Sequence, residues 1–436
     1  MDAMRIYPVR NLRGAIELPG DKSISHRSAL LSAMAAGRAR IENFATSADC
    51  ASTLSCLGGL GVEIETEGAT VTIGGVGKTG FKKPAGPLDC GNSGTTMRLL
   101  GGILAGQGFE SVLTGDESLR KRPMKRIIEP LTSMGAVIGS EDGRAPVRIR
   151  GKSPLTAIDY RPQIASAQLK SCVLLAGLLA RGETSVFEKT PTRDHTERML
   201  EFMGAGICSS DETGGVKLTV SGDAVLSARD MRIPGDISSA AFFMVAAACM
   251  DGSNITLKNA GLNSSRAAII DVLRDFGADI EIVNERESGN EPVGDILVKG
   301  GKNLEPRISP NILSGRIIAN AIDEIPVLAV LGTQVEGGLE IRDAAELRVK
   351  ESDRIAAVVE NLRRMGAGVE EYPDGFKVGR SALKGARIDS FGDHRIAMAF
   401  AIAGLFADGA TEIAGAEFAA VSFPGFFEVL ESVTVR

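Results

Sequence analysis

Apolar residues recur along the chain in a fixed order of helix, glycine and alternating strand. The pattern Leu-x-x-[Leu/Met/Phe]-Gly-[Val/Ala]-x-[Ile/Val] occurs at residues 57–64, 131–138, 200–207, 273–280 and 362–369. An amphipathic run precedes each copy and an alternating run follows it, which predicts a helix closed by a glycine and then a strand. The glycines of this pattern are 74, 69, 73 and 89 residues apart. The spacing predicts a chain built from repeated units.

A second series of more strongly apolar helices interleaves with the first. One of these helices is expected over residues 28–36, with Asp21 or Ser23 as its cap. The helices of this series are expected to end at Gly37, Gly106, Gly182, Gly252, Gly337 and Gly409. A short β-like segment follows each of them. Together the two series predict six α/β units of roughly seventy residues, arranged as two domains of three units.

A repeated five-residue pattern marks the domain boundary. Pro-Gly-Asp with a nearby serine occurs at residues 19–23 and again at residues 234–238, and each copy opens an apolar helix. Three units lie between the copies and three lie after the second. We therefore predict one domain over residues 20–233 and a discontinuous one over residues 1–19 plus 234–436. Two crossings of the chain form a hinge, so we expect the active site in the cleft between the domains.

Composition limits the kind of protein and its partners. The chain has 436 residues, of which 44% are hydrophobic and 24% charged, as expected of a folded globular protein. The net charge of −6 argues against a nucleic acid or an acidic membrane as a partner. The six cysteines show no C-x-x-C spacing, which favours a reducing compartment, and the apolar runs are too short to span a bilayer. We expect a cytoplasmic protein without a signal peptide.

Cations stand beside capping residues at the predicted start of several helices. A helix N-terminus carries free amides and partial positive charge, so acidic residues are expected there. Lys22 and Arg27 instead flank the start of the first apolar helix. The arrangement recurs in residues 91–98, 119–123, 193–195, 350–354 and 392–395. One such cluster by itself is better explained as solvated surface cations, but the recurrence in a net-acidic protein predicts a site for a polyanionic small molecule.

The sequence does not contain the residue patterns that several kinds of catalytic or binding site require. The three histidines have no metal-ligand spacing, and neither a phosphate-binding G-x-x-x-x-G-K-[ST] loop nor a G-x-S-x-G nucleophile elbow occurs. No cysteine lies in the basic clusters, so we expect no metal, no cofactor and no covalent catalysis. Carboxylates next to cations remain for proton transfer, at Asp323-Glu324 and at Glu351. Helix capping and surface ion pairing explain these carboxylates equally well.

Five segments resemble the motifs of the 5-enolpyruvylshikimate-3-phosphate synthases, in the same order and along the whole chain. They are residues 18–27, 91–95, 119–124, 348–354 and 392–398. Residues 166–168, 193–197 and 345–350 are similar to the second class of that family, which is often less sensitive to glyphosate. The resemblance implies two domains, each of three βαβαββ units around a pseudo-threefold axis, in an inside-out α/β barrel. This agrees with the repeats found above.

The resemblance also implies an activity and the residues that carry it. The expected reaction moves the enolpyruvyl group of phosphoenolpyruvate to the 5-hydroxyl of shikimate-3-phosphate. The implied shikimate-3-phosphate ligands are Lys22, Ser23, Arg27, Ser166, Ala167, Gln168, Arg193, Asp323 and Lys350. The implied phosphoenolpyruvate ligands are Lys22, Gly94, Arg122, Gln168, Arg354 and Arg395. Asp323 and Glu351 are the implied proton-transfer pair, with Lys22 as a further participant.

The sequence departs from the family pattern at one place and leaves two alternatives. Many members have a lysine just before a Phe-Pro pair near the C-terminus, where this chain has residues 420–422 before Phe423-Pro424. The first alternative is enolpyruvyl transfer to UDP-N-acetylglucosamine. That family usually has a reactive cysteine in the loop that corresponds to residues 115–122, which here contains none. The second is a non-catalytic anion-binding protein. We expect small-molecule substrates as the partners of a monomer.

Overall fold

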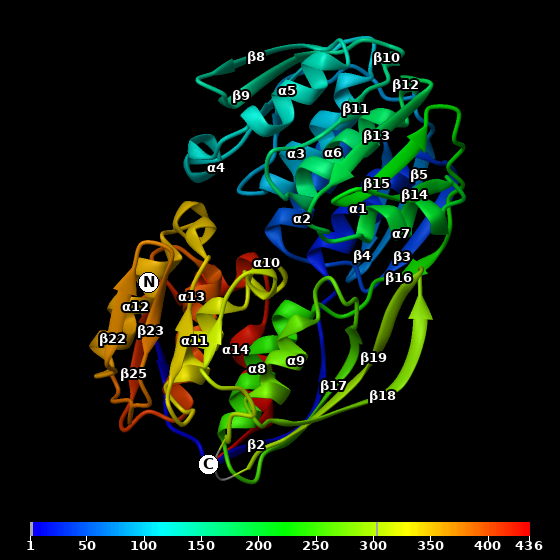
Figure 1. Ribbon diagram of the computed structural model, residues 1–436. Coiled ribbons are helices and arrows are strands. Elements are labelled where there is room, and N and C mark those ends of the chain that lie inside the picture. The colour runs from blue at the N-terminus through cyan, green and yellow to red at the C-terminus, as the bar shows by residue number, and fades with distance from the viewer. Residues whose placement is uncertain (1–2, 302–303) are drawn as a thin grey trace. The chain divides into compact units, whose positions relative to one another are not determined.

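The computed structural model describes residues 3–301 and 304–436 (Figure 1). Contacts between its residues divide the chain into two compact units. Unit 1 contains the chain up to Pro19 together with Pro234–Arg286 and Pro292–Arg436, and unit 2 contains Gly20–Ile233 and Glu287–Glu291. The short segment Glu287–Glu291 thus packs with unit 2, although the residues on either side of it belong to unit 1. No helix among the described residues is long and apolar enough to cross a membrane.

Unit 2 consists of three consecutive repeats. The first contains α1 (Lys22–Met34), β3 (Ala36–Glu42), α2 (Ala48–Gly59), β4 (Glu63–Glu67) and β5 (Thr70–Val76), with β16 (Met231–Arg232). The second contains β6 (Leu88–Asp89), α3 (Gly94–Ala105), β7 (Glu110–Thr114), α4 (Glu117–Lys121), α5 (Lys125–Ser133), β8 (Val137–Glu141) and β9 (Arg144–Arg150). The third contains β11 (Asp159–Tyr160), α6 (Ala167–Gly177), β13 (Glu183–Glu188), α7 (His195–Phe202), β14 (Ile207–Glu212) and β15 (Gly215–Ser221). Strands β10 (Leu155–Thr156) and β12 (Ala180–Arg181) pair with each other.

Unit 1 has the same organisation. Its first repeat contains β2 (Asn11–Glu17), α8 (Ile237–Cys249), β17 (Asn254–Gly261), α9 (Ala268–Asp275), β18 (Asp279–Ser288) and β19 (Glu291–Lys299), with β26 (Thr434–Val435) at the sheet edge. The second contains β20 (Ile312–Leu313), α10 (Arg316–Ala321), α11 (Ile325–Gly332), β21 (Leu339–Ile341), the 3-10 helix η1 (Ala345–Val349), α12 (Arg354–Arg364), β22 (Val369–Tyr372) and β23 (Gly375–Val378). The third contains β24 (Arg387–Asp389), α13 (His394–Leu405), β25 (Thr411–Ala414), η2 (Ala416–Val421), α14 (Phe426–Val433) and β1 (Met4–Ile6).

The sheets of the repeats share one topology, illustrated by the order β6-β7-β9-β8. The first strand pairs in parallel with the strand after the buried helix, and that strand pairs antiparallel with a hairpin. In the last repeat of unit 1, β1 from the N-terminal end takes the antiparallel position beside β25. The prediction of repeated α/β units is confirmed, and the last repeat of unit 1 departs from the βαβαββ order because the sheet of its described residues has only the three strands β1, β25 and β24.

Each unit takes one strand from a distant part of the chain. β2 pairs in parallel with β17, although its next element in sequence is α1 of unit 2. β16 pairs in parallel with β3, although its next element is α8 of unit 1. The chain therefore crosses between the units directly after each of these strands. At the first crossing, a Cβ on Gly20 would lie 1.8 Å from the carbonyl oxygen of Asn43, so this backbone approach requires glycine.

One helix of each repeat is buried on all sides. Every residue of α11 and α13 is buried, and these two helices pack against each other and against α8. Helices that are apolar all round have no solvent face, so they form the centre of a unit. By contrast, α5 and α9 bury one face each, as their amphipathic patterns predict.

The glycines of the first series have the backbone conformation that a helix end requires. Gly61, Gly135, Gly204, Gly277 and Gly366 have φ between +84° and +101°. Residues with a Cβ rarely adopt a backbone with positive φ, which explains why glycine closes the helix in each copy of the pattern. The second series differs, because α6 already ends at Gly177 and α8 at Cys249, before Gly182 and Gly252.

The first apolar helix is longer and earlier than its hydrophobic run predicts. It begins at Lys22, because the side chain of Asp21 accepts a hydrogen bond from the Ile24 amide at 2.9 Å. It ends at Met34, and Gly37 already lies in β3. The polar residues of its first two turns therefore belong to the helix itself, and Arg27 among them is buried.

Candidate active site

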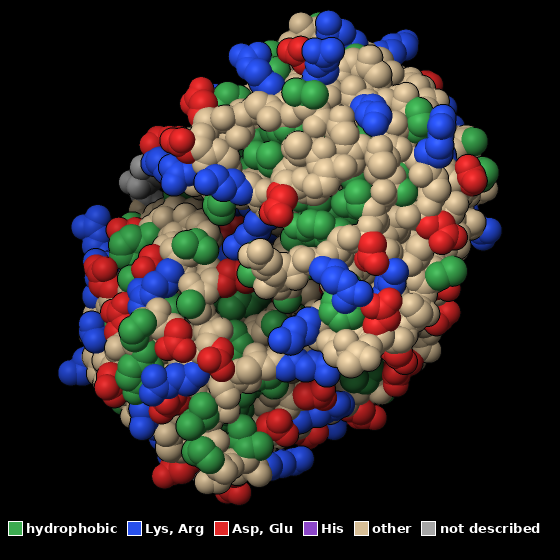
Figure 2. All heavy atoms as spheres, turned by 45° about the horizontal axis from the view of Figure 1, so that its top comes forward, with side chains coloured by type: hydrophobic (Ala, Val, Ile, Leu, Met, Phe, Trp, Pro, Cys, Tyr) green, Lys and Arg blue, Asp and Glu red, His purple; other side chains and the backbone are tan. Residues whose placement is uncertain are grey.

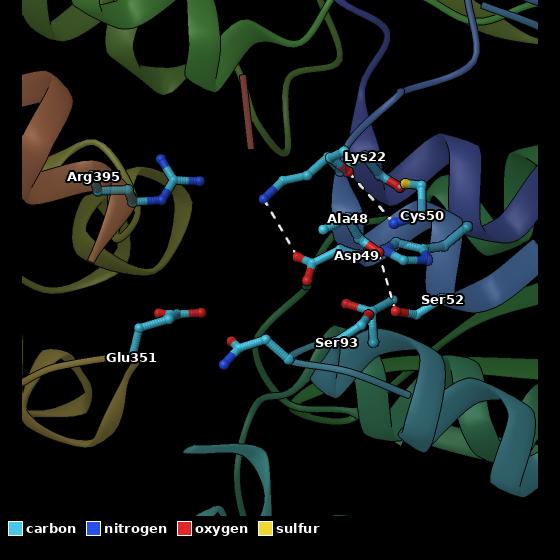
Figure 3. Close-up of polar contacts among 12 residues, drawn as sticks. Lys22, Ala48, Asp49, Cys50, Ser52, Ser93, Glu351 and Arg395 are labelled. Atoms are coloured by element: carbon cyan, nitrogen blue, oxygen red, sulfur yellow. Dashed lines mark hydrogen bonds and ion pairs between the residues drawn. The ribbon is translucent and has the colours of Figure 1, made fainter. Parts of the chain in front are cut away.

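The start of α1 holds an ion pair in unit 2. Lys22 is the first residue of α1, and its Nζ lies 3.7 Å from Oδ2 of Asp49 in the first turn of α2. A dashed line in Figure 3 marks this ion pair. Both side chains are partly exposed, at 16% and 19%. The pair therefore places a solvent-accessible ammonium at a helix N-terminus, where a phosphate could replace the carboxylate. Asp49 was not among the residues expected from the sequence.

Arg27 is a buried structural donor in this conformation. Its Nε donates to Oγ1 of Thr196 at 2.7 Å, its Nη2 to Oγ of Ser171 at 2.9 Å, and its Nη1 to the carbonyl oxygen of Ser23 at 2.8 Å. Burial lowers the pKa of Arg27 to about 10, so the side chain remains a cation near neutral pH. Arg193 precedes α7 within electrostatic range of Arg27. The hydrogen bonds of Arg27 to Ser171 and Thr196 join α1 to α6 and α7.

A second polar chain joins α1 to α2 and α3. Nδ1 of His26 lies 2.6 Å from Oγ1 of Thr53, which lies 2.6 Å from Oγ1 of Thr96. The hydroxyl of Thr96 donates in turn to Oγ of Ser93, the cap of α3. Burial, followed by the charges of Lys22 and Arg27, lowers the pKa of His26 to about 3. His26 is therefore a neutral packing residue that fixes these helix starts relative to each other.

The starts of α3 and α6 bring several predicted residues together. Oε1 of Gln168 accepts from Nη1 of Arg98 at 2.7 Å, and its Nε2 donates to Oγ1 of Thr95 at 2.9 Å. A Cβ on Gly94 would lie 2.6 Å from Nη1 of Arg98 and 3.6 Å from Nη1 of Arg122. Arg98 and Arg122 thus both lie next to Gly94, and Arg98 also contacts Gln168. Arg98 was not among the site residues expected from the sequence, although it ends the motif at residues 91–98. This cluster concentrates positive charge around a glycine.

The remaining predicted residues of unit 2 lie close to this cluster in sequence and structure. Arg122 donates to the side chain and the backbone oxygen of Asn92, at 2.7 and 3.3 Å. Ser166 caps α6 by accepting from the Leu169 amide at 3.3 Å, and Ala167 is the first residue of that helix. Their backbone amides are therefore the free donors of a helix start, which suit an anionic ligand.

In unit 1, Asp323 lies among arginines. Its Oδ2 is 3.6 Å from Nη1 of Arg266 and 3.9 Å from Nη2 of Arg395, and its Oδ1 is 3.5 Å from Nη1 of Arg354. Nη1 of Arg395 also donates to the backbone oxygen of Asp323 at 2.8 Å. The carboxylate is 14% exposed. Positive charge at these distances favours the ionised carboxylate, which can accept a proton.

Glu351 and Asp323 contact the same guanidinium. Nη2 of Arg354 donates to Oε2 of Glu351 at 2.7 Å, and Arg354 is buried while Glu351 is 25% exposed. Lys350 immediately precedes Glu351, and its Nζ lies 3.3 Å from Oε1 of Glu346. The structure therefore brings together Asp323, Glu351, Arg354 and Arg395, whereas Lys350 has a more exposed partner.

The C-terminal departure from the family pattern lies in η2 and the residues after it. Ala420 and Val421 end this 3-10 helix, and Ser422 is buried. The Oγ of Ser422 has no hydrogen-bond partner among the described residues. A lysine contact to phosphate has no counterpart in these three side chains.

Comparison with known proteins identifies the family. The family model described as EPSP synthase (3-phosphoshikimate 1-carboxyvinyltransferase) matches residues 6–430. The chain belongs to the EPSP synthase family. A 3-phosphoshikimate 1-carboxyvinyltransferase of Salinibacter ruber is 52% identical over 431 residues, which cover 98% of each chain. One of Solibacter usitatus is 50% identical and covers 98% of this chain and 99% of the relative.

Solved structures support the same family. An EPSP synthase structure from Acinetobacter baumannii has a TM-score of 0.89 and 43% identity, and it covers 100% of this chain and 99% of that one. A second structure of EPSP synthase from this organism has a TM-score of 0.87. The chain has the two-domain enolpyruvyl transferase fold of the EPSP synthase family. It is a transferase of the shikimate pathway, which leads to the aromatic amino acids, and the resemblance seen in its motifs is confirmed.

Proposed function

We propose that this EPSP synthase family member transfers the 1-carboxyvinyl group of phosphoenolpyruvate to the 5-hydroxyl of shikimate-3-phosphate. The observation that carries the proposal is the carboxylate of Asp323, which lies 3.5 Å from Nη1 of Arg354 and 3.9 Å from Nη2 of Arg395. A base next to guanidinium groups suits a reaction in which a hydroxyl must lose a proton close to bound anions.

Residues of both units are proposed to hold the substrates. For shikimate-3-phosphate they are Lys22, Ser23, Arg27, Ser166, Ala167, Gln168, Arg193, Asp323 and Lys350. For phosphoenolpyruvate they are Lys22, Gly94, Arg122, Gln168, Arg354 and Arg395. Guanidinium groups bind carboxylate and phosphate oxygens in pairs of parallel hydrogen bonds, so the arginines supply orientation as well as charge. Arg27 donates three of its five N–H groups to protein acceptors, which leaves one on Nη1 and one on Nη2 for a substrate oxygen.

The proposed reaction is an addition followed by an elimination. The 5-hydroxyl oxygen forms a bond to C2 of phosphoenolpyruvate and gives its proton to Asp323, while C3 receives a proton from Glu351 or Lys22. The bond from C2 to the phosphate oxygen then breaks, phosphate leaves with the electron pair, and C3 returns a proton to the protein. Arg354 contacts both carboxylates, so it can hold the proton donor and the proton acceptor in a fixed relation.

A phosphate-release assay tests this activity. The protein is supplied with phosphoenolpyruvate and either shikimate-3-phosphate or UDP-N-acetylglucosamine. We expect continuous phosphate release with shikimate-3-phosphate and none with UDP-N-acetylglucosamine, since residues 115–122 contain no cysteine. Binding of both substrates without release would instead identify a non-catalytic anion-binding protein.

We also propose that the protein is a cytoplasmic monomer. The support for the cytoplasm is the absence of C-x-x-C spacing and of any apolar run long enough to span a bilayer. The monomer rests on the following measurement alone. Sedimentation velocity at micromolar concentration is expected to give the mass of one chain, about 46 kDa. A boundary at twice that mass would contradict the monomer.

A further inference from the structure

Arg266 is a buried arginine next to Asp323, the proposed base. None of the family motifs recognised in the sequence contains Arg266. It lies in the turn between β17 and α9, where its amide donates to the carbonyl oxygen of Asn263 at 2.8 Å. Only 3% of the residue is exposed. Arginine is seldom buried to this extent unless it is paired with an acceptor of opposite charge. Its position therefore depends on the groups that its guanidinium contacts.

Two of these contacts point to Asp323 and its neighbour. Nη1 of Arg266 lies 3.6 Å from Oδ2 of Asp323, and Nη2 donates to the hydroxyl of Ser238 at the start of α8. That hydroxyl donates in turn to Oε1 of Glu324. Arg266 is thus anchored to α8 on one side and faces the carboxylate of Asp323 on the other.

The repeats give an independent reason to regard this position as functional. Arg266 precedes its repeat glycine, Gly277, by 11 residues, the same interval that separates Arg193 from Gly204. In two other repeats, Arg122 precedes Gly135 by 13 residues and Arg354 precedes Gly366 by 12 residues. Each of these arginines stands at or just before the second helix of its repeat. Arg266 therefore occupies the place at which other repeats carry a proposed substrate ligand.

Arg266 differs from Arg354 and Arg395 in what it can do. Those two arginines are proposed to bind phosphoenolpyruvate, and each also contacts Asp323, so substrate binding competes for their donors. The side chain of Arg266 is 4% exposed and tied to Ser238. It can keep a positive charge next to Oδ2 throughout the reaction, which favours the ionised carboxylate and restricts its rotation.

We propose that Arg266 is a positioning residue that holds Asp323 in its ionised, proton-accepting orientation. This inference rests on the proposed function, because it assigns Arg266 a role only through Asp323. Misplacing a reacting group by about 1 Å can cost roughly 100-fold in rate. We therefore expect Arg266→Gln to lower kcat by about 10-fold to 100-fold while the KM values of both substrates change by less than about 3-fold.

The first test compares three single variants with the intact protein. Arg266→Lys keeps a positive charge near Asp323 and is expected to recover most of the kcat that Arg266→Gln loses. Arg274→Gln is the matched control, because Arg274 lies on α9 with 38% exposure and pairs with Asp271. It is expected to leave kcat unchanged. Thermal unfolding of each variant shows whether a loss of rate follows a loss of folded protein, and a purely structural Arg266 would lower both together.

A double-mutant cycle with Asp323→Asn decides whether the effect passes through Asp323. If it does, Arg266→Gln adds less than about 2-fold to the loss caused by Asp323→Asn alone, because the group it positions is already gone. Multiplicative losses would overturn the proposal, as would wild-type kcat in Arg266→Gln. Should Arg266→Gln not fold, Ser238→Ala takes its place in the cycle, because it removes the hydroxyl that anchors Nη2 of Arg266. Wild-type turnover with shikimate-3-phosphate is measured separately, so failure of the proposed function is recognised by itself.

Discussion

Arg354 and Asp393 form a buried ion pair in which Nε lies 2.8 Å from Oδ2. The side chains are 1% and 0% exposed. Although burial alone would lower the pKa of Arg354, the carboxylates of Asp393, Glu351 and Asp323 raise it. Burial alone would likewise raise the pKa of Asp393, but Arg354 and then His394 lower it. Asp393 also caps α13 through the amide of Arg395, so the pair joins two helix starts and two proposed substrate ligands.

Arg354→Met is expected to destabilise the protein strongly. The variant leaves Asp393 buried without its main opposite charge, and breaking a buried pair in this way costs about 3–5 kcal/mol. Urea denaturation measures the loss as a lower midpoint at an unchanged slope. Lys121→Met is the control, because Lys121 and Glu117 form an exposed pair on α4 and its loss should leave the midpoint nearly unchanged. Equal midpoints for the two variants would contradict the buried pair's role.

Asp323→Asn is expected to separate proton transfer from binding. Asparagine keeps the shape and can still hydrogen-bond substrate hydroxyls, but it cannot accept a proton. We expect turnover to fall by about 10²- to 10⁴-fold, while the affinity for shikimate-3-phosphate changes by less than about tenfold. Steady-state rates and titration calorimetry measure the two effects. Turnover within a few-fold of wild type would move the proton transfer to Glu351 or Lys22, and a collapse of binding would make Asp323 an orienting residue.

Gly94→Ala is expected to change the response to glyphosate. For the unaltered protein we expect weak to moderate inhibition. The new Cβ would lie 2.6 Å from Nη1 of Arg98, which also donates to Oε1 of Gln168. The methyl group must therefore displace Arg98 and Gln168 or occupy space that a ligand would use. The inhibition constant of glyphosate should rise more than the KM of phosphoenolpyruvate, measured in the same assay. Equal increases would show that this position does not discriminate between the two ligands.

His26 is expected to remain neutral throughout the physiological pH range. Its pKa is about 3 in the folded protein, below the value of about 6.5 for a free histidine. The unfolded chain therefore binds an additional proton as the pH falls from 6.5 toward 3, and stability is lost over that window. His26→Gln should reduce the slope of unfolding free energy against pH by up to about 1.4 kcal/mol per pH unit. Identical slopes, or an imidazole signal that titrates near pH 6.5, would exclude the neutral state.

The local sequence pattern was sufficient to predict the repeats and the kind of ligand that their helix starts suit. The glycines from Gly61 to Gly366 close helices because only glycine readily takes the left-handed backbone that the helix end requires. The second series of helices was predicted from its strongly apolar runs, and α11 and α13 of that series are buried along their whole length. The cation-rich helix starts pointed to an anionic ligand before any contact was known. These features depend on a few neighbouring residues, so the sequence contains them directly.

Contacts between distant residues were decided by the tertiary structure. The pairing of β2 with β17 and of β16 with β3 cannot be found by local pattern, because each strand lies next in sequence to a helix of the other unit. Arg98 meets Gln168 across 70 residues, and Arg266 meets Asp323 across 57. The sequence by itself determined the repeats, the central helices and the positively charged helix starts. Tertiary packing alone selected which carboxylate faces which guanidinium, because ion pairing depends on distances that chain order does not fix.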